Sequence, residues 1–103
     1  MKNQAQMMQQ IKKMQQNMER VQEELAEATV VGAAGGNVVT VEMHGDFRVK
    51  KITVGKDAVD PDDIETLEDL LVIACNDAIA KVQELSGKKM GAVTGGMRIP
   101  GLM

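Results

Sequence analysis

Aromatic side chains are almost absent from this chain of 103 residues, which holds one phenylalanine, Phe47, and neither tryptophan nor tyrosine. Proteins that recognise unpaired bases usually stack them on aromatic rings. The scarcity of such rings therefore argues against sequence-specific binding of single-stranded nucleic acid. Nine methionines and many aliphatic residues supply the apolar content instead, so we expect an aliphatic and thioether core.

The sequence also offers no pair of cysteines for a disulfide and no segment that could span a membrane. Cys75 is the one cysteine and cannot form an internal disulfide. The chain opens with no charged-then-apolar leader, and no apolar run approaches the roughly 20 residues that span a bilayer. These features predict a cytoplasmic protein with no membrane partner.

Acidic side chains are absent from both ends, although the chain has 15 acids against 12 bases. Residues 1–18 and 86–103 carry three basic residues each and no acid, whereas residues 57–85 carry nine acids and one base. Such segregation can indicate a polyanionic partner that the net charge of −3 conceals.

A heptad pattern marks the first segment as a helix. Its apolar positions follow spacings of four and three: Met7, Ile11, Met14, Met18, Val21, Leu25 and Ala28. A helix over residues 3–28 would be about 39 Å long, longer than a compact domain of this size. We expect it to overhang its own domain and to meet a second subunit, although its C-terminal half could instead fold back on the sheet.

Three short strands are expected next, joined by turns. The first covers Thr29–Val31 and ends at Gly32, with Gly35-Gly36-Asn37 as the following turn. The second alternates, with Val39, Val41 and Met43 on its buried face. The third starts at Phe47, and its alternation slips at Lys50-Lys51, which suggests a bulge. Short connections predict an antiparallel meander.

A second helix follows, with Asp60 as the expected N-cap and Pro61 at its first helical position. Gly87 is expected to end it. The resulting order predicts a two-layer α+β domain of helix, three strands and helix over residues 1–86. Residues 87–103 are then a flexible, basic, glycine-rich tail.

The sequence shows no convincing catalytic or metal-binding motif. His44 is expected in a solvated turn without a nearby nucleophile, and Cys75 is expected to be a small core residue. The acids of residues 57–65 lack the spacing of a calcium loop, and "GAAGGN" opens onto a strand rather than a helix. We expect no enzyme, no metal, no cofactor and no small-molecule substrate.

The basic ends are the candidate site. They contribute Lys2, Lys12, Lys13, Lys88, Lys89 and Arg98. Such residues often only keep a protein soluble. Because they are held apart from the acids, they favour contact with the phosphates of duplex DNA, with little reading of bases.

Four stretches of the sequence resemble one known family: "MMQQIKKMQQNMERVQEEL", "VTVEMHGDFRVKKITV", "LEDLLVIACNDAIAKVQEL" and "MGAVTGGMRIPGLM". This is the YbaB/EbfC family of bacterial nucleoid-associated proteins, and the resemblance covers essentially the whole chain. It implies an α-β-β-β-α fold and a tweezer-shaped homodimer. It also implies a non-enzymatic protein of the cytoplasm and nucleoid that binds double-stranded DNA, alters its conformation and affects gene expression.

The same resemblance adds Arg20 to the DNA-binding candidates. Arg20 could instead pair with Glu23 or Glu24 on the same helix. A different function also stays open, because the methionine-rich heptad face could bind a partner helix and make the chain a protein-interaction adaptor.

Overall fold

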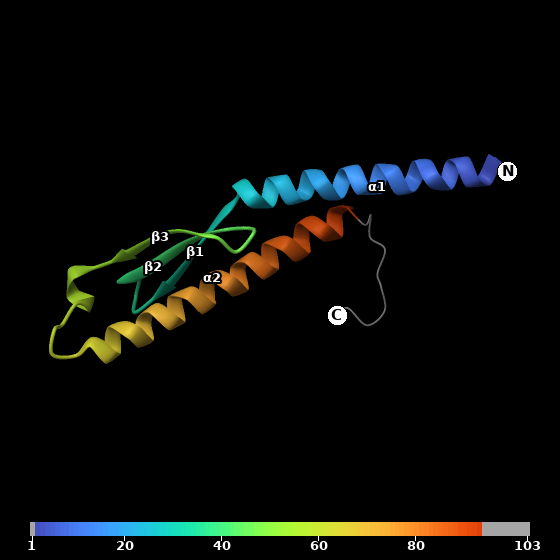
Figure 1. Cartoon of the computed structure of the whole chain (residues 1–103). Coiled ribbons are helices and arrows are strands. Elements are labelled where there is room, and N and C mark those ends of the chain that lie inside the picture. The colour runs from blue at the N-terminus through green and yellow to red at the C-terminus, as the bar shows by residue number, and fades with distance from the viewer. Residues whose placement is uncertain (1, 94–103) are drawn as a thin grey trace.

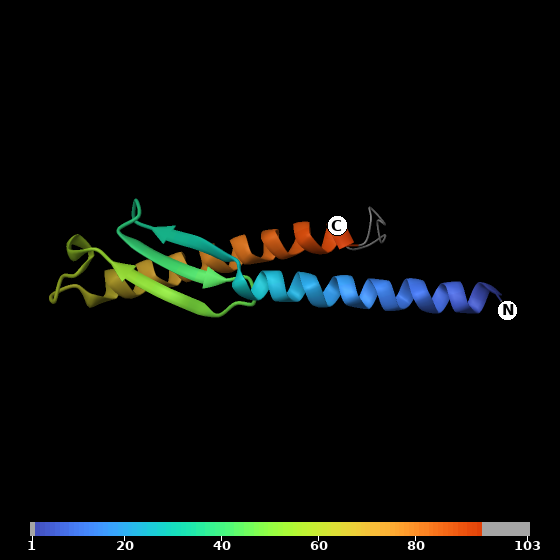
Figure 2. The same ribbon diagram turned by 90° about the horizontal axis from the view of Figure 1, so that it is seen from above.

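The computed structural model describes residues 2–93, which form two helices around a three-stranded sheet. Figure 1 shows α2 lying along one face of the sheet, while α1 leaves the end of the sheet and continues beyond it. Seen from above in Figure 2, α1 extends roughly in the direction of the strands. The predicted α+β arrangement of helix, three antiparallel strands and helix is confirmed.

Helix α1 spans Lys2–Glu27 and is anchored only near its C-terminal end. Val21 and Leu25 are buried there, whereas Met7 and Ile11 are 63% and 53% exposed. At about 1.5 Å per residue its 26 residues span about 39 Å. The molecule is correspondingly elongated, with extents of 73 × 27 × 16 Å. The predicted overhang of this helix is confirmed.

The sheet is an antiparallel meander of β1 (Thr29–Ala34), β2 (Val39–His44) and β3 (Val49–Val54), in that spatial order. The prediction that the first strand ends at Gly32 was wrong. Gly32 stays in the strand because α2 lies directly against it, and a Cβ there would be 2.3 Å from the Ala74 carbonyl oxygen. This glycine therefore permits close packing and does not mark a turn.

The β2–β3 connection covers residues 45–48 and is longer than predicted. The Arg48 carbonyl accepts a hydrogen bond from the His44 amide (2.8 Å), and the His44 carbonyl accepts one from Phe47 (2.9 Å). Phe47 consequently lies in the turn with a φ of 69°, and the third strand begins at Val49. Its predicted start at Phe47 was wrong.

The predicted break in the side-chain alternation of β3 corresponds to a β-bulge. Glu42 pairs with Lys51, but the next residue of β2, Met43, pairs with Val49. Lys50 is the extra residue on β3. The change of side-chain parity in the sequence therefore corresponds to a real irregularity of the ladder.

Helix α2 spans Ile64–Val93 and is capped by Asp63. The Asp63 carboxylate accepts hydrogen bonds from the Thr66 amide (3.3 Å) and the Thr66 hydroxyl (2.6 Å). The predicted cap, Asp60, was wrong. It opens a turn containing Pro61, in which the Asp63 amide donates to the Asp60 carbonyl (2.9 Å). The short helix η1 (Lys56–Ala58) precedes this turn.

The other end of α2 also differs from the prediction. The helix continues through Gly87 and Gly91 to Val93, so its expected end at Gly87 was wrong. A glycine inside a helix costs about 1 kcal/mol relative to alanine. Contacts of this last segment with α1, including an ion pair between Lys89 and Glu24, offset that cost. Residues 87–93 are thus helical, and the remainder of the expected tail, 94–103, lies outside the described residues.

The core lies between α2 and the first two strands. It consists mainly of side chains from β2 and α2: Val39, Val41, Met43, Ala74, Ala78 and Val82. The predicted buried face of the second strand is confirmed. Helix α2 packs against β1 and β2, and it leaves Val49, Ile52 and Val54 of β3 50%, 46% and 37% exposed.

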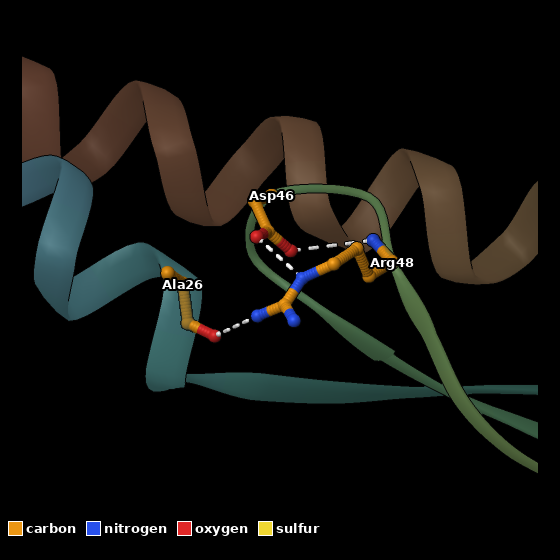
Figure 3. A network of polar contacts seen from close by, with 3 residues as sticks. All are labelled: Ala26, Asp46 and Arg48. Carbon is orange, nitrogen blue, oxygen red and sulfur yellow. Dashed lines mark hydrogen bonds and ion pairs between the residues drawn. The ribbon is translucent and has the colours of Figure 1, made fainter.

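A polar corner fixes the start of the sheet relative to the end of α1 (Figure 3). The Arg48 guanidinium donates to the Asp46 carboxylate (2.7 Å) and to the Ala26 carbonyl at the helix C-terminus (3.2 Å). Desolvation raises the pKa of Asp46, but the hydrogen bonds and charge of Arg48 outweigh it and hold that pKa below its ordinary value. Gly45 completes the corner, since a Cβ there would lie 2.5 Å from the Leu25 carbonyl oxygen.

Candidate nucleic-acid interface

Three of the predicted DNA-binding residues lie exposed on α1. Lys12, Lys13 and Arg20 project from the helix into solvent, and no side chain within residues 2–93 pairs with any of them. Lys2 begins the same helix, but its side chain is outside the described set. This helix therefore offers cationic groups that form no ion pair with a carboxylate of residues 2–93.

The alternative partner for Arg20 is engaged elsewhere. The Glu24 carboxylate accepts a hydrogen bond from the Lys89 ammonium at 3.2 Å. This ion pair joins α1 to α2, and its two residues are 65 positions apart in the sequence. Arg20 forms no ion pair with Glu23 or Glu24 in the described part of the chain. The structure thus leaves Arg20 available and occupies Lys89 instead.

The lysines near the end of α2 are both paired. Lys88 lies 3.4 Å from Glu84, one helical turn earlier, and Lys89 is bound to Glu24. The Lys88–Glu84 pair is highly exposed, and such pairs contribute little stability and separate easily. Lys89 is only 31% exposed, so it is the more firmly held of the two. Arg98, the remaining candidate, lies outside the described residues.

Charge is unevenly distributed along the molecule. Lys12 and Lys13 lie on the overhanging half of α1, whereas η1 and the start of α2 form the other end of the long axis (Figure 1). That second end carries a cluster of carboxylates: Asp57, Asp60, Asp62, Asp63 and Glu65. Because salt screens charges beyond about 10 Å at 0.1 M, the acidic end does not neutralise the arm at its distance.

The outer edge of β1 is occupied by side chains of α2. The Ala33 amide donates to Asp77 (2.9 Å), and Lys81 donates to the Val31 carbonyl (2.7 Å) while lying 3.2 Å from Asp77. The backbone hydrogen bond from Ala33, followed by the hydrogen bond and charge of Lys81, lowers the pKa of Asp77. These contacts use polar groups that an added strand would need.

The other chemically reactive residues do not assemble into a site. His44 is half-buried at the end of β2, so its expected place in a solvated turn was wrong. Its Nδ1 is buried without a hydrogen-bond partner among the residues described. Cys75 is half-buried and packs against the core. Across residues 2–93, no three His, Cys, Asp or Glu side chains come together as metal ligands, and neither helix is apolar over a length that crosses a membrane.

The pairing of Lys89 with Glu24 is the main feature that sequence analysis missed. Local spacing identifies partners three or four positions away on one helix. It gives no sign of a partner 65 positions distant on another helix. Only the approach of α2 to α1 brings the two residues together.

Comparison with models of known protein families shows which family this chain belongs to. The model of the YbaB/EbfC DNA-binding family matches residues 1–97. The chain belongs to this family. The YbaB/EbfC resemblance recognised in the sequence is therefore confirmed.

Individual YbaB/EbfC relatives align along almost their whole length. A nucleoid-associated protein of Chloroflexus aurantiacus is 49% identical over 96 residues, covering 93% of this chain and 96% of the relative. One of Roseiflexus castenholzii is 50% identical over 99 residues, covering 96% and 98%. A solved structure of an uncharacterized Helicobacter pylori protein is similar with a TM-score of 0.77, covering 88% of this chain and 96% of that one. At 19% identity, that structure supports the fold alone.

Proposed function

We propose that this YbaB/EbfC protein is a non-enzymatic, nucleoid-associated protein of the cytoplasm that binds double-stranded DNA as a homodimer. Binding rests mainly on phosphate contacts from its basic ends, and it alters DNA conformation and thereby nucleoid organisation and gene expression. The observation that carries the proposal is the exposed pair Lys12 and Lys13 on the overhanging half of α1, which forms no ion pair within residues 2–93 and lies far from the acidic cluster at the other end of the molecule.

The arm supplies a larger share of the contacts than the end of α2. Lys12, Lys13 and Arg20 are free to bind phosphate, whereas Lys89 must first leave Glu24. Lys88 is exposed enough to exchange Glu84 for a phosphate at little cost. The mechanism therefore begins on α1, with Lys88 and Arg98 as additional contacts.

The part of the sheet that α2 leaves exposed, over β3, supports the homodimer. Ile52 and Val54 pair with the core residues Val41 and Val39, so they point toward the same face of the sheet but are not covered by α2. The β1 edge is already bound by Asp77 and Lys81. A second copy therefore covers β3, the strand whose apolar side chains remain exposed.

A salt titration tests DNA binding. If about four phosphates are neutralised, log affinity falls with log salt at a slope near −3.6, and raising salt from about 50 to 200 mM costs on the order of a hundredfold. Lys12→Ala with Lys13→Ala is expected to flatten the slope by about 0.9 for each phosphate contact that is lost. Lys51→Ala with Lys56→Ala removes the same charge from the sheet end and serves as the control. A salt-independent affinity contradicts the phosphate mechanism.

The dimer has its own test on β3. Ile52→Asp places a carboxylate on the uncovered apolar face and is expected to yield a monomer in sedimentation analysis. Thr53→Asp is the matched control, because the adjacent position of a strand points to the opposite face. A dimer that survives Ile52→Asp excludes this face as the interface.

A protein-interaction adaptor is the second candidate, favoured by the exposure of Met7 (63%) and Met14 (42%) on the arm. Polar substitutions at Met7, Met14 and Met18 distinguish the two functions. For an adaptor they abolish partner binding and leave the dimer intact. For a DNA-binding protein they loosen the dimer or its arms and reduce DNA binding only indirectly.

A further inference from the structure

A second heptad seam runs along α1, and it is entirely polar. It follows spacings of four and three residues: Lys2, Gln6, Gln9, Lys13, Gln16 and Arg20. Each of its members from Gln6 onward is exposed. On a helix with about 100° between successive residues, this seam lies opposite the methionine seam. The arm thus presents amides and cations on the face that the apolar side chains do not use.

The amides lie between two cations. Lys12 and Lys13 point about 100° apart around the helix axis, and Gln9 and Gln16 point between them. Gln9, Lys12, Lys13 and Gln16 accordingly line one solvent-open stretch of the α1 surface.

Resting on the DNA binding proposed above, we propose that α1 lies in the major groove and reads adenine. Gln9 and Gln16 hydrogen-bond to N6 and N7 of adenines, while Lys12 and Lys13 contact phosphates on the two walls of the groove. A helix with its side chains is about 10–12 Å wide, and the major groove is about 12 Å wide. Glutamine pairs bidentately with adenine and with no other base in the same way.

The spacing of the two amides defines the expected sequence preference. Seven residues separate Gln9 from Gln16, which is about 10.5 Å along the helix. Base pairs follow one another at about 3.4 Å, so the two adenines are about three base pairs apart. The phosphate contacts provide most of the affinity, and the amides provide discrimination between sequences.

Selection from randomised duplexes with the full-length protein tests this reading. We expect enrichment of two A·T pairs about three base pairs apart. Replacing those adenines by 7-deazaadenine removes the N7 acceptor and leaves every phosphate in place. Each of the two adenines loses one of its two hydrogen bonds to glutamine, so together they lose about one bidentate contact, worth 1–3 kcal/mol. The affinity is therefore expected to fall between about fivefold and 150-fold.

Variants assign the reading to the named amides. Gln9→Ala with Gln16→Ala is expected to lose the adenine preference and the 7-deazaadenine effect, while binding of unselected DNA and its salt slope persist. Gln4→Ala with Gln15→Ala alters two amides on the other side of the helix and should retain the preference. Lys12→Ala with Lys13→Ala should flatten the salt slope without changing the preferred bases.

Two outcomes overturn the inference, and they are distinguishable. If duplex DNA binds but 7-deazaadenine has no effect, or if the Gln9/Gln16 variant keeps the preference, base reading by this face is excluded and DNA binding stands. If the wild-type protein binds no duplex even at low salt, the proposed function fails and the inference fails with it.

Discussion

The Lys89 ammonium lies 3.2 Å from the Glu24 carboxylate, so the end of α2 is tied to the anchored half of α1. The contact has two effects. It stabilises the helical form of residues beyond Gly87, and it withholds one cation from any external phosphate. The proposed DNA binding and the packing of the two helices would therefore compete for the Lys89 side chain.

This competition predicts the effect of Glu24→Gln. The substitution releases Lys89, which then contacts an additional phosphate, and the salt slope of DNA binding should steepen by about 0.9 per protomer. Glu23→Gln removes an equal charge that forms no described ion pair and should leave the slope unchanged. Equal slopes for Glu24→Gln and the wild type would mean that Glu24 does not withhold Lys89 from DNA.

Gly87→Ala tests whether the helix continues. Gly87 has no positive φ, and a Cβ there would meet nothing within 4 Å. Alanine should therefore stabilise the folded protein by about 1 kcal/mol, measured by denaturant unfolding. If the helix ended at Gly87 in a left-handed conformation, the same change would destabilise it.

Gly32→Ala should have the opposite effect. The new methyl group would lie 2.3 Å from the Ala74 oxygen and 2.4 Å from the Ala78 amide nitrogen. Both are backbone atoms, so α2 must move away from β1. We expect a loss of about 3 kcal/mol or more in the free energy of unfolding, in contrast to the Gly87 variant under the same conditions. A loss below 1 kcal/mol would contradict the close packing.

Acid should weaken the contact between α2 and β1. The folded protein lowers the pKa of Asp77, so the ionised form is favoured by folding. Its contribution is present above the ordinary carboxyl pKa and is lost as the pH falls through the lower folded value. Denaturant unfolding at pH 6 and pH 3 should show a smaller loss for Asp77→Asn than for the wild type, because the variant lacks this titrating group. Equal losses would exclude Asp77 as a contributor.

The sequence predicted the structural features that leave a periodic pattern of apolar side chains along one helix or strand. Val39, Val41 and Met43 alternate because one face of β2 is buried, and that period is visible in the sequence. The heptad of α1 identified its helix and its overhang in the same way. The slip at Lys50-Lys51 indicated the bulge, because a bulge changes the parity of side chains that flank it.

The ends of β1 and α2 were predicted wrongly because they depend on tertiary packing and turn geometry, which the local sequence does not show. Gly32 and Gly87 look alike in the sequence, but one lies beneath a helix and the other lies inside one. Asp60 and Asp63 are both plausible caps, and the turn through Pro61 decides for the later one. For the candidate site, charge segregation indicated the cationic arm. It could not show that Lys89 has a distant acidic partner.

The corner formed by Asp46, Arg48 and the Ala26 carbonyl has a mechanical consequence. It lies near the fixed end of a lever about 39 Å long. A rotation of about 10° at this pivot displaces the far end of α1 by about 7 Å, twice the rise of a base pair. In the proposed complex with DNA, small adjustments among these three residues would change which part of the duplex the far end of α1 contacts.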